Sequence, residues 1–148
     1  MAIKVVEKKK KVLVAGTFQI IHPGHVRFLN EAARLGQVWV VISRNRNVRK
    51  GFPVVVDEKQ RLDVVQALKP VYKAILGSEN DFLAPVRRVR PDIILLGPDQ
   101  MSKECLKAKL KAAMGLKCME IEVRKLRKKI RKHKLHSTSR IIREIRKI

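Results

Sequence analysis

Short apolar runs that alternate with segments of helical spacing constrain the fold of this chain most. Val12–Ala15 and Val38–Ile42 are continuous apolar runs, so each predicts a strand that is buried on both faces. The same reasoning predicts strands at residues 71–76, 92–96 and 118–123, and helices at 24–35, 58–68, 80–90, 102–114 and 139–148. This order of elements predicts an α/β fold, a doubly wound parallel sheet of five strands in a single domain.

Local signals fix several helix ends. Asp57 and Ser102 are residues that favour N-caps, and Gly115 is a natural stop for the helix that begins after Ser102. The last helix carries an apolar stripe that we expect to be buried, formed by Ile141, Ile142 and Ile145.

The positive charge of the chain is extreme for its size and predicts polyanionic partners. The 148 residues carry a net charge of +22, which attracts nucleotides, coenzymes and nucleic acids alike. Residues 1–10 are expected to form a basic lead-in to a domain of residues 11–148. The run 124–134 consists mostly of Lys and Arg, but it lacks interleaved aromatic residues for base stacking. Nucleic-acid binding is therefore a secondary expectation.

Neither a membrane span nor a secretory leader is expected. No apolar run approaches the roughly 20 residues of a spanning helix, and the first ten residues lack an apolar stretch. Cys105 and Cys118 form neither a Cys-x-x-Cys pair nor a zinc-binding spacing. We expect both to be reduced thiols, and we expect a cytoplasmic location.

One turn, Gly16–His25, concentrates residues that chemistry needs. It joins the first strand to the first helix, and in an open α/β sheet such a turn lies at the carboxyl end of the strands, where ligands bind. The backbone N–H groups of Gly16 and Thr17, and the start of the following helix, favour an anion. His22 and His25 flank a Pro-Gly pair, so both imidazoles can stabilise negative charge on phosphorus. The chain has neither Gly-x-Gly-x-x-Gly nor a P-loop, which argues against a dehydrogenase or a P-loop NTPase.

The sequence Gly-Thr-Phe-Gln-Ile-Ile-His-Pro-Gly-His at residues 16–25 resembles the first motif of the cytidylyltransferase-like nucleotidyltransferases. His136–Ile142 stands where that superfamily has its second motif, a helix start rich in Ser and Thr. Residues 58–61, 67–71, 73–78 and 91–100 further resemble the archaeal FAD synthases, which are FMN adenylyltransferases. The resemblance spans roughly residues 11–146 and implies a Rossmann-like nucleotidyltransferase fold.

The resemblance also implies roles for the residues of both motifs. His22 and His25 would be the catalytic pair, holding oxygens of the α- and β-phosphates. The nucleotide would be bound by Gly16, Thr17, Phe18, Asp99, Ser137, Thr138, Ser139 and Arg140. The candidates for binding the acceptor are Arg44, Lys50 and Asn30. No residue is assigned as a metal ligand.

The implied reaction moves a nucleoside monophosphate from a nucleoside triphosphate to a phosphate acceptor and releases pyrophosphate, with FMN and ATP giving FAD. A divalent metal such as Mg²⁺ would accompany the triphosphate. The family often dimerises, so a homodimer is left open. One alternative is a cytidylyltransferase that uses CTP and a small polyol or amino-alcohol phosphate such as glycerol 3-phosphate. Another is a degenerate relative that binds nucleotide or RNA without turnover.

Two positions depart from the pattern of the family. Gln19 stands where the family usually has Asp, and Asn45 stands where it tends to have Asp after the second strand. Each change removes a carboxylate that could hold a metal. The related nicotinamide mononucleotide adenylyltransferases also have Gln at the first position, so Gln19 is compatible with catalysis.

Overall fold

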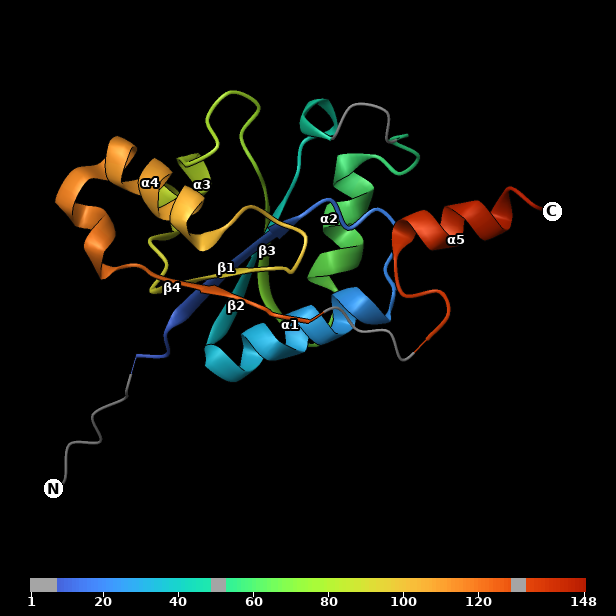
Figure 1. Cartoon of the computed structure of the whole chain (residues 1–148), viewed down its shortest axis with the longest axis horizontal. Coiled ribbons are helices and arrows are strands. Elements are labelled where there is room, and N and C mark those ends of the chain that lie inside the picture. Colours follow the sequence, from blue (N-terminus) through green and yellow to red (C-terminus); the bar gives the residue numbers. More distant parts are fainter. Residues whose placement is uncertain (1–7, 49–52, 129–132) are drawn as a thin grey trace, which may run out of the picture.

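Five parallel strands form one sheet in the order β3-β2-β1-β4-β5 (Figure 1). The computed structural model describes residues 8–48, 53–128 and 133–148. Its strands are β1 (Lys11–Gly16), β2 (Gln37–Ile42), β3 (Val71–Leu76), β4 (Ile93–Leu96) and β5 (Glu122–Lys125). β1 pairs with both β2 and β4, so the strand order reverses at β1. In doubly wound sheets, this reversal creates a ligand crevice at the carboxyl ends of the strands.

Helices cover both faces of the sheet, which confirms the predicted fold class. They are α1 (Pro23–Leu35), α2 (Glu58–Gln66), α3 (Ala84–Val89), α4 (Lys103–Met114) and α5 (Thr138–Ile145), with short 3₁₀ turns η1 (Asn45–Asn47) and η2 (Gly115–Glu120). One core packs α1 and α2 against Val40 and Ile42 of β2. The other packs α3 and α4 against Val41, the residue between them, because successive strand side chains point to opposite faces. Figure 1 shows the two helix pairs on opposite sides of the sheet.

The predicted caps form where the sequence places them. The side chain of Asp57 accepts a hydrogen bond of 2.9 Å from the backbone N–H of Lys59. Ser102 Oγ accepts one of 3.1 Å from the N–H of Cys105. Gly115 ends α4 with a φ of 58°, a left-handed value that favours glycine.

Two predicted elements begin later in the structure than the sequence indicated. The strand predicted at residues 118–123 is wrong at its start, since Cys118 lies in η2 and β5 begins at Glu122. Its only partner strand in the described chain is β4, which begins at Ile93, opposite Glu122, so no ladder precedes that pair. The helix predicted from residue 80 begins at Ala84, because the Asp81 carboxylate accepts a hydrogen bond from the N–H of Leu83 and forms a turn there.

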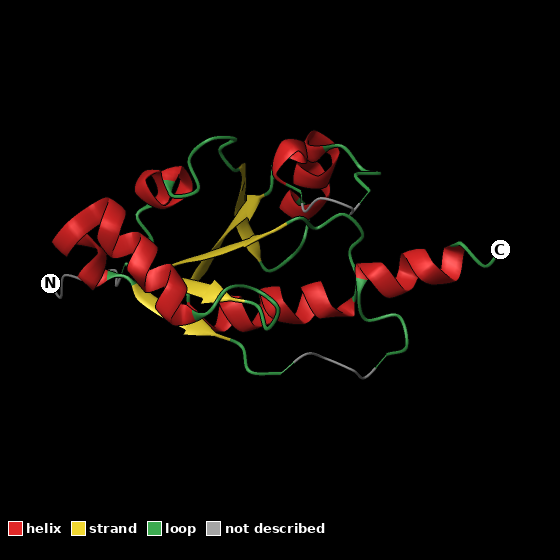
Figure 2. Cartoon of the chain, turned by 45° about the horizontal axis from the view of Figure 1, so that its top comes forward, coloured by secondary structure: helices red, strands yellow, loops and turns green. Residues whose placement is uncertain are grey.

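The predicted burial is wrong at both ends of the chain. Ala15, at the end of β1, is exposed and lines the crevice. In α5, Ile141 and Ile142 are only half-buried and Ile145 is 58% exposed. Figure 1 and Figure 2 both show the reason, because α5 extends from the edge of the molecule, away from α3 and α4. An apolar stripe is buried only where another element packs on it.

Within the part of the chain that the structure describes, no helix combines the length and the apolar character that crossing a membrane requires. Cys105 is exposed and Cys118 is half-buried, and both are free thiols.

Candidate active site

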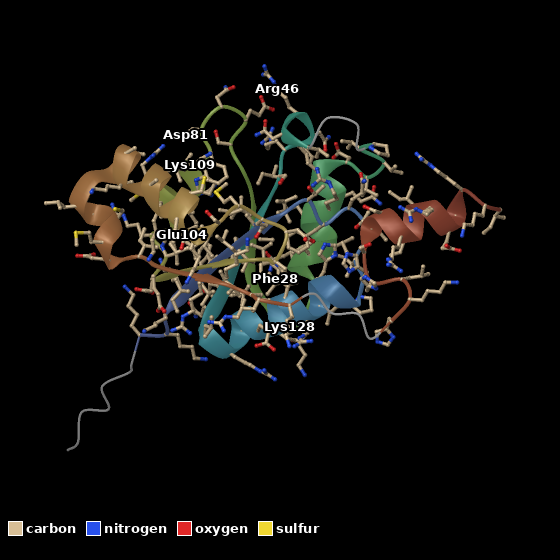
Figure 3. The ribbon with its side chains drawn as sticks, in the orientation of Figure 1. Phe28, Arg46, Asp81, Glu104, Lys109 and Lys128 are labelled. Carbon is tan, nitrogen blue, oxygen red and sulfur yellow. The ribbon has the colours of Figure 1, made fainter. Side chains whose placement is uncertain are left out.

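A cavity of about 850 Å³ lies at the carboxyl ends of β1 and β4. Its walls come from the turn after β1, from α1, from the loop after β4, from the segment after β5 and from the start of α5. The lining residues are Ala15, Gly16, Phe18, His22, Gly24, His25, Arg27, Phe28, Glu31, Gly97, Pro98, Asp99, Gln100, Leu126, Arg127, Lys128, His136, Ser137 and Arg140. Figure 3 shows two of them, Phe28 on α1 and Lys128 on the segment after β5, on the α1 side of the sheet.

Phe18 anchors the turn that begins the site. Its side chain is 3% exposed and its φ of 50° is left-handed, so the chain turns sharply after β1. A Cβ atom at Gly16 would lie 2.8 Å from the Phe18 ring, which explains the glycine at that position. The Phe18 ring lies 4.8 Å from the ring of His25. The turn therefore places the Phe18 ring against one side of His25, a candidate catalytic residue.

His22 and His25 stack on one another at the start of α1. Their ring centroids are 3.8 Å apart and their planes are inclined by 27°. His22 is the N-cap of α1, and its Nδ1 accepts a hydrogen bond of 3.1 Å from the N–H of Gly24. In the neutral ring, the proton is therefore on Nε2, which makes that atom a hydrogen-bond donor.

Both imidazoles are neutral near pH 7. Burial, and then the neighbouring His22, lower the pKa of His25 from 6.5 to about 3, against a raising effect of the Ile20 backbone. Burial and then His136 lower the pKa of His22. A neutral imidazole carries one N–H and can donate one hydrogen bond through it. The positive charge of the cavity comes instead from four lining cations, Arg27, Arg127, Lys128 and Arg140, against two carboxylates, Glu31 and Asp99.

The second motif, at residues 136–142, contacts the first motif, at residues 16–25, next to the N-terminus of α1. Ser137 caps α5, with its Oγ accepting from the N–H of Arg140 at 3.4 Å. Thr138 Oγ1 donates to the carbonyl oxygen of Ile20 at 3.5 Å. A Cβ atom at Gly24 would lie 3.0 Å from the carbonyl oxygen of His136 and 2.8 Å from the His22 ring. Glycine at position 24 therefore allows the two motifs to approach.

Gln100 fixes the loop after β4 beside β1. Its Nε2 donates to the carbonyl oxygen of Ala15 at 2.8 Å, and its Oε1 accepts from the N–H of Gly97 at 2.6 Å. Lys125 Nζ donates to the carbonyl oxygen of Gln100 at 2.7 Å. These bonds explain why Gln ends the Gly-Pro-Asp-Gln stretch, and they present the exposed Asp99 to the cavity.

The predicted site residues divide into three groups. Those that line the cavity are Gly16, Phe18, His22, His25, Asp99, Ser137 and Arg140. Those that adjoin it without lining it are Thr17, Thr138 and Ser139. The third group holds the acceptor candidates. Asn30 lines a second cavity of about 800 Å³ that shares His22, Arg27 and Glu31 with the first. Arg44 forms ion pairs with Glu58 and Glu79, and Lys50 lies outside the described residues.

Gln19 and Asn45, the two departures from the family pattern, belong to a structural network behind the turn. Gln19 is 6% exposed, and its amide donates to the carbonyl oxygen of Pro53 at 2.7 Å and accepts from the N–H of Val55 at 2.6 Å. Asn45 Oδ1 accepts from Arg61 Nη2 at 2.8 Å. Gln19 thus joins the turn after β1 to the segment before α2, Asn45 joins η1 to α2, and neither side chain lines the cavity.

Arg61 is the centre of this network, and the sequence reading did not identify it. It is 1% exposed and donates to the carbonyl oxygens of Thr17, Ser43 and Val56, besides Asn45. A weak signal existed, because Arg61 precedes the buried Val65 by four residues and so shares its helix face. The sequence reading also did not identify Arg27, Phe28 and Glu31, which follow Gly24 at helical spacing, or Leu126, Arg127 and Lys128.

The family model described as cytidylyltransferase-like matches residues 13–144. The chain belongs to this family. It is 47% identical over 146 residues to the FAD synthase of Methanothermobacter marburgensis, covering 94% of this chain and 87% of that protein. It is 48% identical over 117 residues to the FAD synthase of Ferroglobus placidus, covering 78% of this chain and 76% of that protein.

A solved structure agrees with the fold. The crystal structure described as a lipopolysaccharide core biosynthesis protein from Thermoplasma volcanium superposes with a TM-score of 0.75 at 35% identity. The match covers 83% of this chain and 99% of that chain. This cytidylyltransferase-like chain is therefore a nucleotidyltransferase whose relatives include several FAD synthases.

Proposed function

We propose that this chain transfers AMP from ATP to FMN and so makes FAD and pyrophosphate. One observation carries the proposal: His22, His25 and the Ser137 helix start converge on one cationic cavity, in a chain 47% identical to an FAD synthase. Either feature alone is compatible with other nucleotidyl transfers.

The proposed chemistry needs no covalent enzyme intermediate. A phosphate oxygen of FMN attacks the α-phosphorus of ATP, a new P–O–P bond forms, and the bond to the β-phosphate breaks. Pyrophosphate leaves with the electrons of that bond. Catalysis of this kind consists of positioning and charge stabilisation.

We assign the charge stabilisation to neutral donors close to the reacting phosphorus. Nε2–H of His22 points away from the Nδ1 that caps α1, so it is available to a phosphate oxygen. His25 stacks on His22 and is held from its other side by Phe18. Preorganised donors of this kind lower the barrier because they need no reorientation during the reaction.

The cationic walls would hold the remaining phosphates. Arg140 and the N–H groups at the start of α5 favour the β- and γ-phosphates, since a helix N-terminus favours anions. Arg127 and Lys128 line the same cavity from the segment after β5. Asp99 is assigned to the nucleoside, as the family resemblance implies. Asn30 stays an acceptor candidate, in the second cavity that shares His22.

A divalent metal fits this site as a companion of the triphosphate. Mg²⁺ usually keeps several waters and takes one or two carboxylates besides substrate phosphates. Glu31 and Asp99 are the carboxylates that line the cavity, while no three His, Cys, Asp or Glu side chains of the described ranges cluster as ligands. When bound, the metal would neutralise charge on the phosphates.

The test is a matrix of nucleoside triphosphates and phosphate acceptors with Mg²⁺, read by pyrophosphate release and by chromatography of the product. FAD from ATP and FMN is the expected result. Product from CTP and glycerol 3-phosphate, without FAD, would replace the proposal with the cytidylyltransferase alternative. Binding of nucleotide without pyrophosphate from any pair would support the degenerate relative. The homodimer and the cytoplasmic location stay predictions.

A further inference from the structure

An aromatic pair lies at the opposite end of the sheet from the active-site cavity. Trp39 of β2 and Tyr72 of β3 have ring centroids 5.6 Å apart, with planes inclined by 52°. Tyr72 is 56% exposed and Trp39 is half-buried. Farther along the same strands, Val41 and Ile75 are buried under α3 and α4. The helices therefore leave the amino-terminal half of β2 and β3 open on this face.

A β-bulge presents the pair at the sheet edge. Val71 pairs with Val38, but Lys73 pairs with Trp39, so Tyr72 is the extra residue on the edge strand. Bulges turn side chains away from the regular alternation. Lys73 is exposed and is the register partner of Trp39, which places it on the same face. The edge thus offers an aromatic ring next to a cation.

Further cations border the rings. Lys11 Nζ lies 5.5 Å from the centroid of Trp39 and donates to the carbonyl oxygen of Val89 at 3.0 Å. Arg88 and Arg90, which flank Val89, are exposed. We call Trp39 and Tyr72, with these neighbouring cations and Lys73, the aromatic shelf. Figure 1 shows the chain entering β1 on the side of the molecule far from α5.

The two carboxylates at the starts of β4 and β5, beyond β1 from the shelf, are engaged. Asp92 accepts a hydrogen bond of 2.7 Å from the backbone N–H of Lys11. Glu122 accepts from Arg124 at 2.5 Å. A second copy of a chain with a charge of +22 would meet like charge here. Charge complementarity therefore points to a polyanion, and the exposed Tyr72 ring points to one with flat, stackable groups.

We propose that the aromatic shelf binds single-stranded nucleic acid without base specificity. One base stacks on Tyr72 beside Trp39, and the lysines and arginines around the rings neutralise neighbouring phosphates. Stacking platforms beside cationic grooves are the usual means of such binding, since every base has a π-face. This function is independent of the proposed FAD synthesis, because the shelf and the cavity share no residue.

The number of cations also distinguishes this ligand from a mononucleotide. Lys11, Lys73, Arg88 and Arg90 can neutralise several phosphates, and each phosphate neutralised on a single strand adds about 0.7 to the salt slope. The wild type is therefore expected to bind more weakly as salt rises, with a slope that Lys73→Ala reduces by about 0.7. The basic run 124–134 would contribute slope as well, so salt dependence alone does not identify the site.

Trp39 makes the test specific, because it is the one tryptophan of the chain. Full-length protein is titrated with a 12-nucleotide oligo(dT) or oligo(rU), while Trp39 fluorescence and the anisotropy of a labelled copy are both recorded. Binding at the shelf quenches Trp39 with the same midpoint as the anisotropy change. An abasic strand of equal length is expected to bind at least fivefold more weakly, since one stack is worth about 1–3 kcal/mol.

Phe82 supplies a matched control. It is 58% exposed and has Lys109 Nζ 5.3 Å from its ring, so it resembles Tyr72 in exposure and cation contact. Tyr72→Ala should weaken binding at least fivefold, Tyr72→Phe should restore it, and Phe82→Ala should leave it unchanged. FAD synthesis by all three should match the wild type, which shows that they fold.

Three results would overturn the proposal. One is oligonucleotide binding that leaves Trp39 fluorescence unchanged, which would assign binding to the basic run. Another is equal affinity of the Tyr72→Ala and Phe82→Ala variants. The third is a dimer in sedimentation experiments that Tyr72→Ala dissociates, which would make the shelf a self-association surface.

Discussion

The rings of His22 and His25 stack with centroids 3.8 Å apart, while Nδ1 of His22 accepts the N–H of Gly24. One imidazole is therefore both the cap of α1 and a wall of the cavity. A substitution can therefore keep the helix cap while it removes the proposed phosphate donor. Asparagine does this, because it can cap a helix but cannot replace the imidazole Nε2.

His22→Asn should lower the turnover number by about 10²–10³, the usual cost of removing one preorganised donor. The free energy of unfolding should change by less than about 0.5 kcal/mol, because Asn still accepts from Gly24. Steady-state pyrophosphate release and urea denaturation measure the two quantities. Near-normal turnover in His22→Asn, and also in His25→Ala, would refute the assigned role of the pair.

The protein should lose stability in mild acid because of His25. Its pKa is about 3 in the folded chain against 6.5 ordinarily, so the unfolded chain binds the proton more tightly. The neutral His25 ring makes its full contribution to the free energy of unfolding above pH 6.5. This contribution is lost as the pH falls towards 3. Between pH 7.5 and pH 5 the loss should be about 2 kcal/mol.

Urea denaturation at both pH values measures this loss, and the variant His25→Gln isolates it. The wild type should lose about 2 kcal/mol more than the variant, because glutamine does not titrate. Equal losses in the two proteins would show that His25 is not desolvated as the structure indicates.

Replacing Arg61 by Met should destabilise the fold by about 3 kcal/mol or more. The carbonyl oxygens of Thr17, Ser43 and Val56 would lose their donor, and each buried unsatisfied group costs about 1–3 kcal/mol. Thermal and urea denaturation measure the effect. Gln60→Met, at the exposed neighbouring position on α2, is the matched control and should cost less than about 0.5 kcal/mol. Similar values for both variants would contradict the network.

Gln19→Glu tests whether position 19 is structural. The Gln19 amide donates to the carbonyl oxygen of Pro53, and a carboxylate would repel that oxygen. The variant should lose about 1–3 kcal/mol of unfolding free energy at pH 7.5, and less at pH 5, where a protonated carboxyl can donate. The exposed Gln60→Glu is the control. A gain in pyrophosphate release on adding Mg²⁺, with unchanged stability, would instead support a metal-binding role at position 19.

The sequence by itself determined the order of elements and pointed to the turn that holds the candidate site. The apolar run Val38–Ile42 and the caps at Asp57 and Ser102 depend on neighbours a few residues away, so their signals are local. The turn at residues 16–25 was identified for the same reason, since its glycines and histidines are consecutive. Its place at the carboxyl end of β1 then follows from the geometry of parallel sheets.

Only the tertiary structure decided which side chains are buried and which groups they bond. The helical spacing of Ile141, Ile142 and Ile145 predicts an apolar stripe, but not whether another layer packs on it. Arg61 is charged and yet 1% exposed, because three separate loops bring carbonyl oxygens to it. Gln19 resembles a lost metal ligand in the sequence, and the fold makes it a buried link to Pro53. Such contacts join residues far apart in the chain, so no local pattern encodes them.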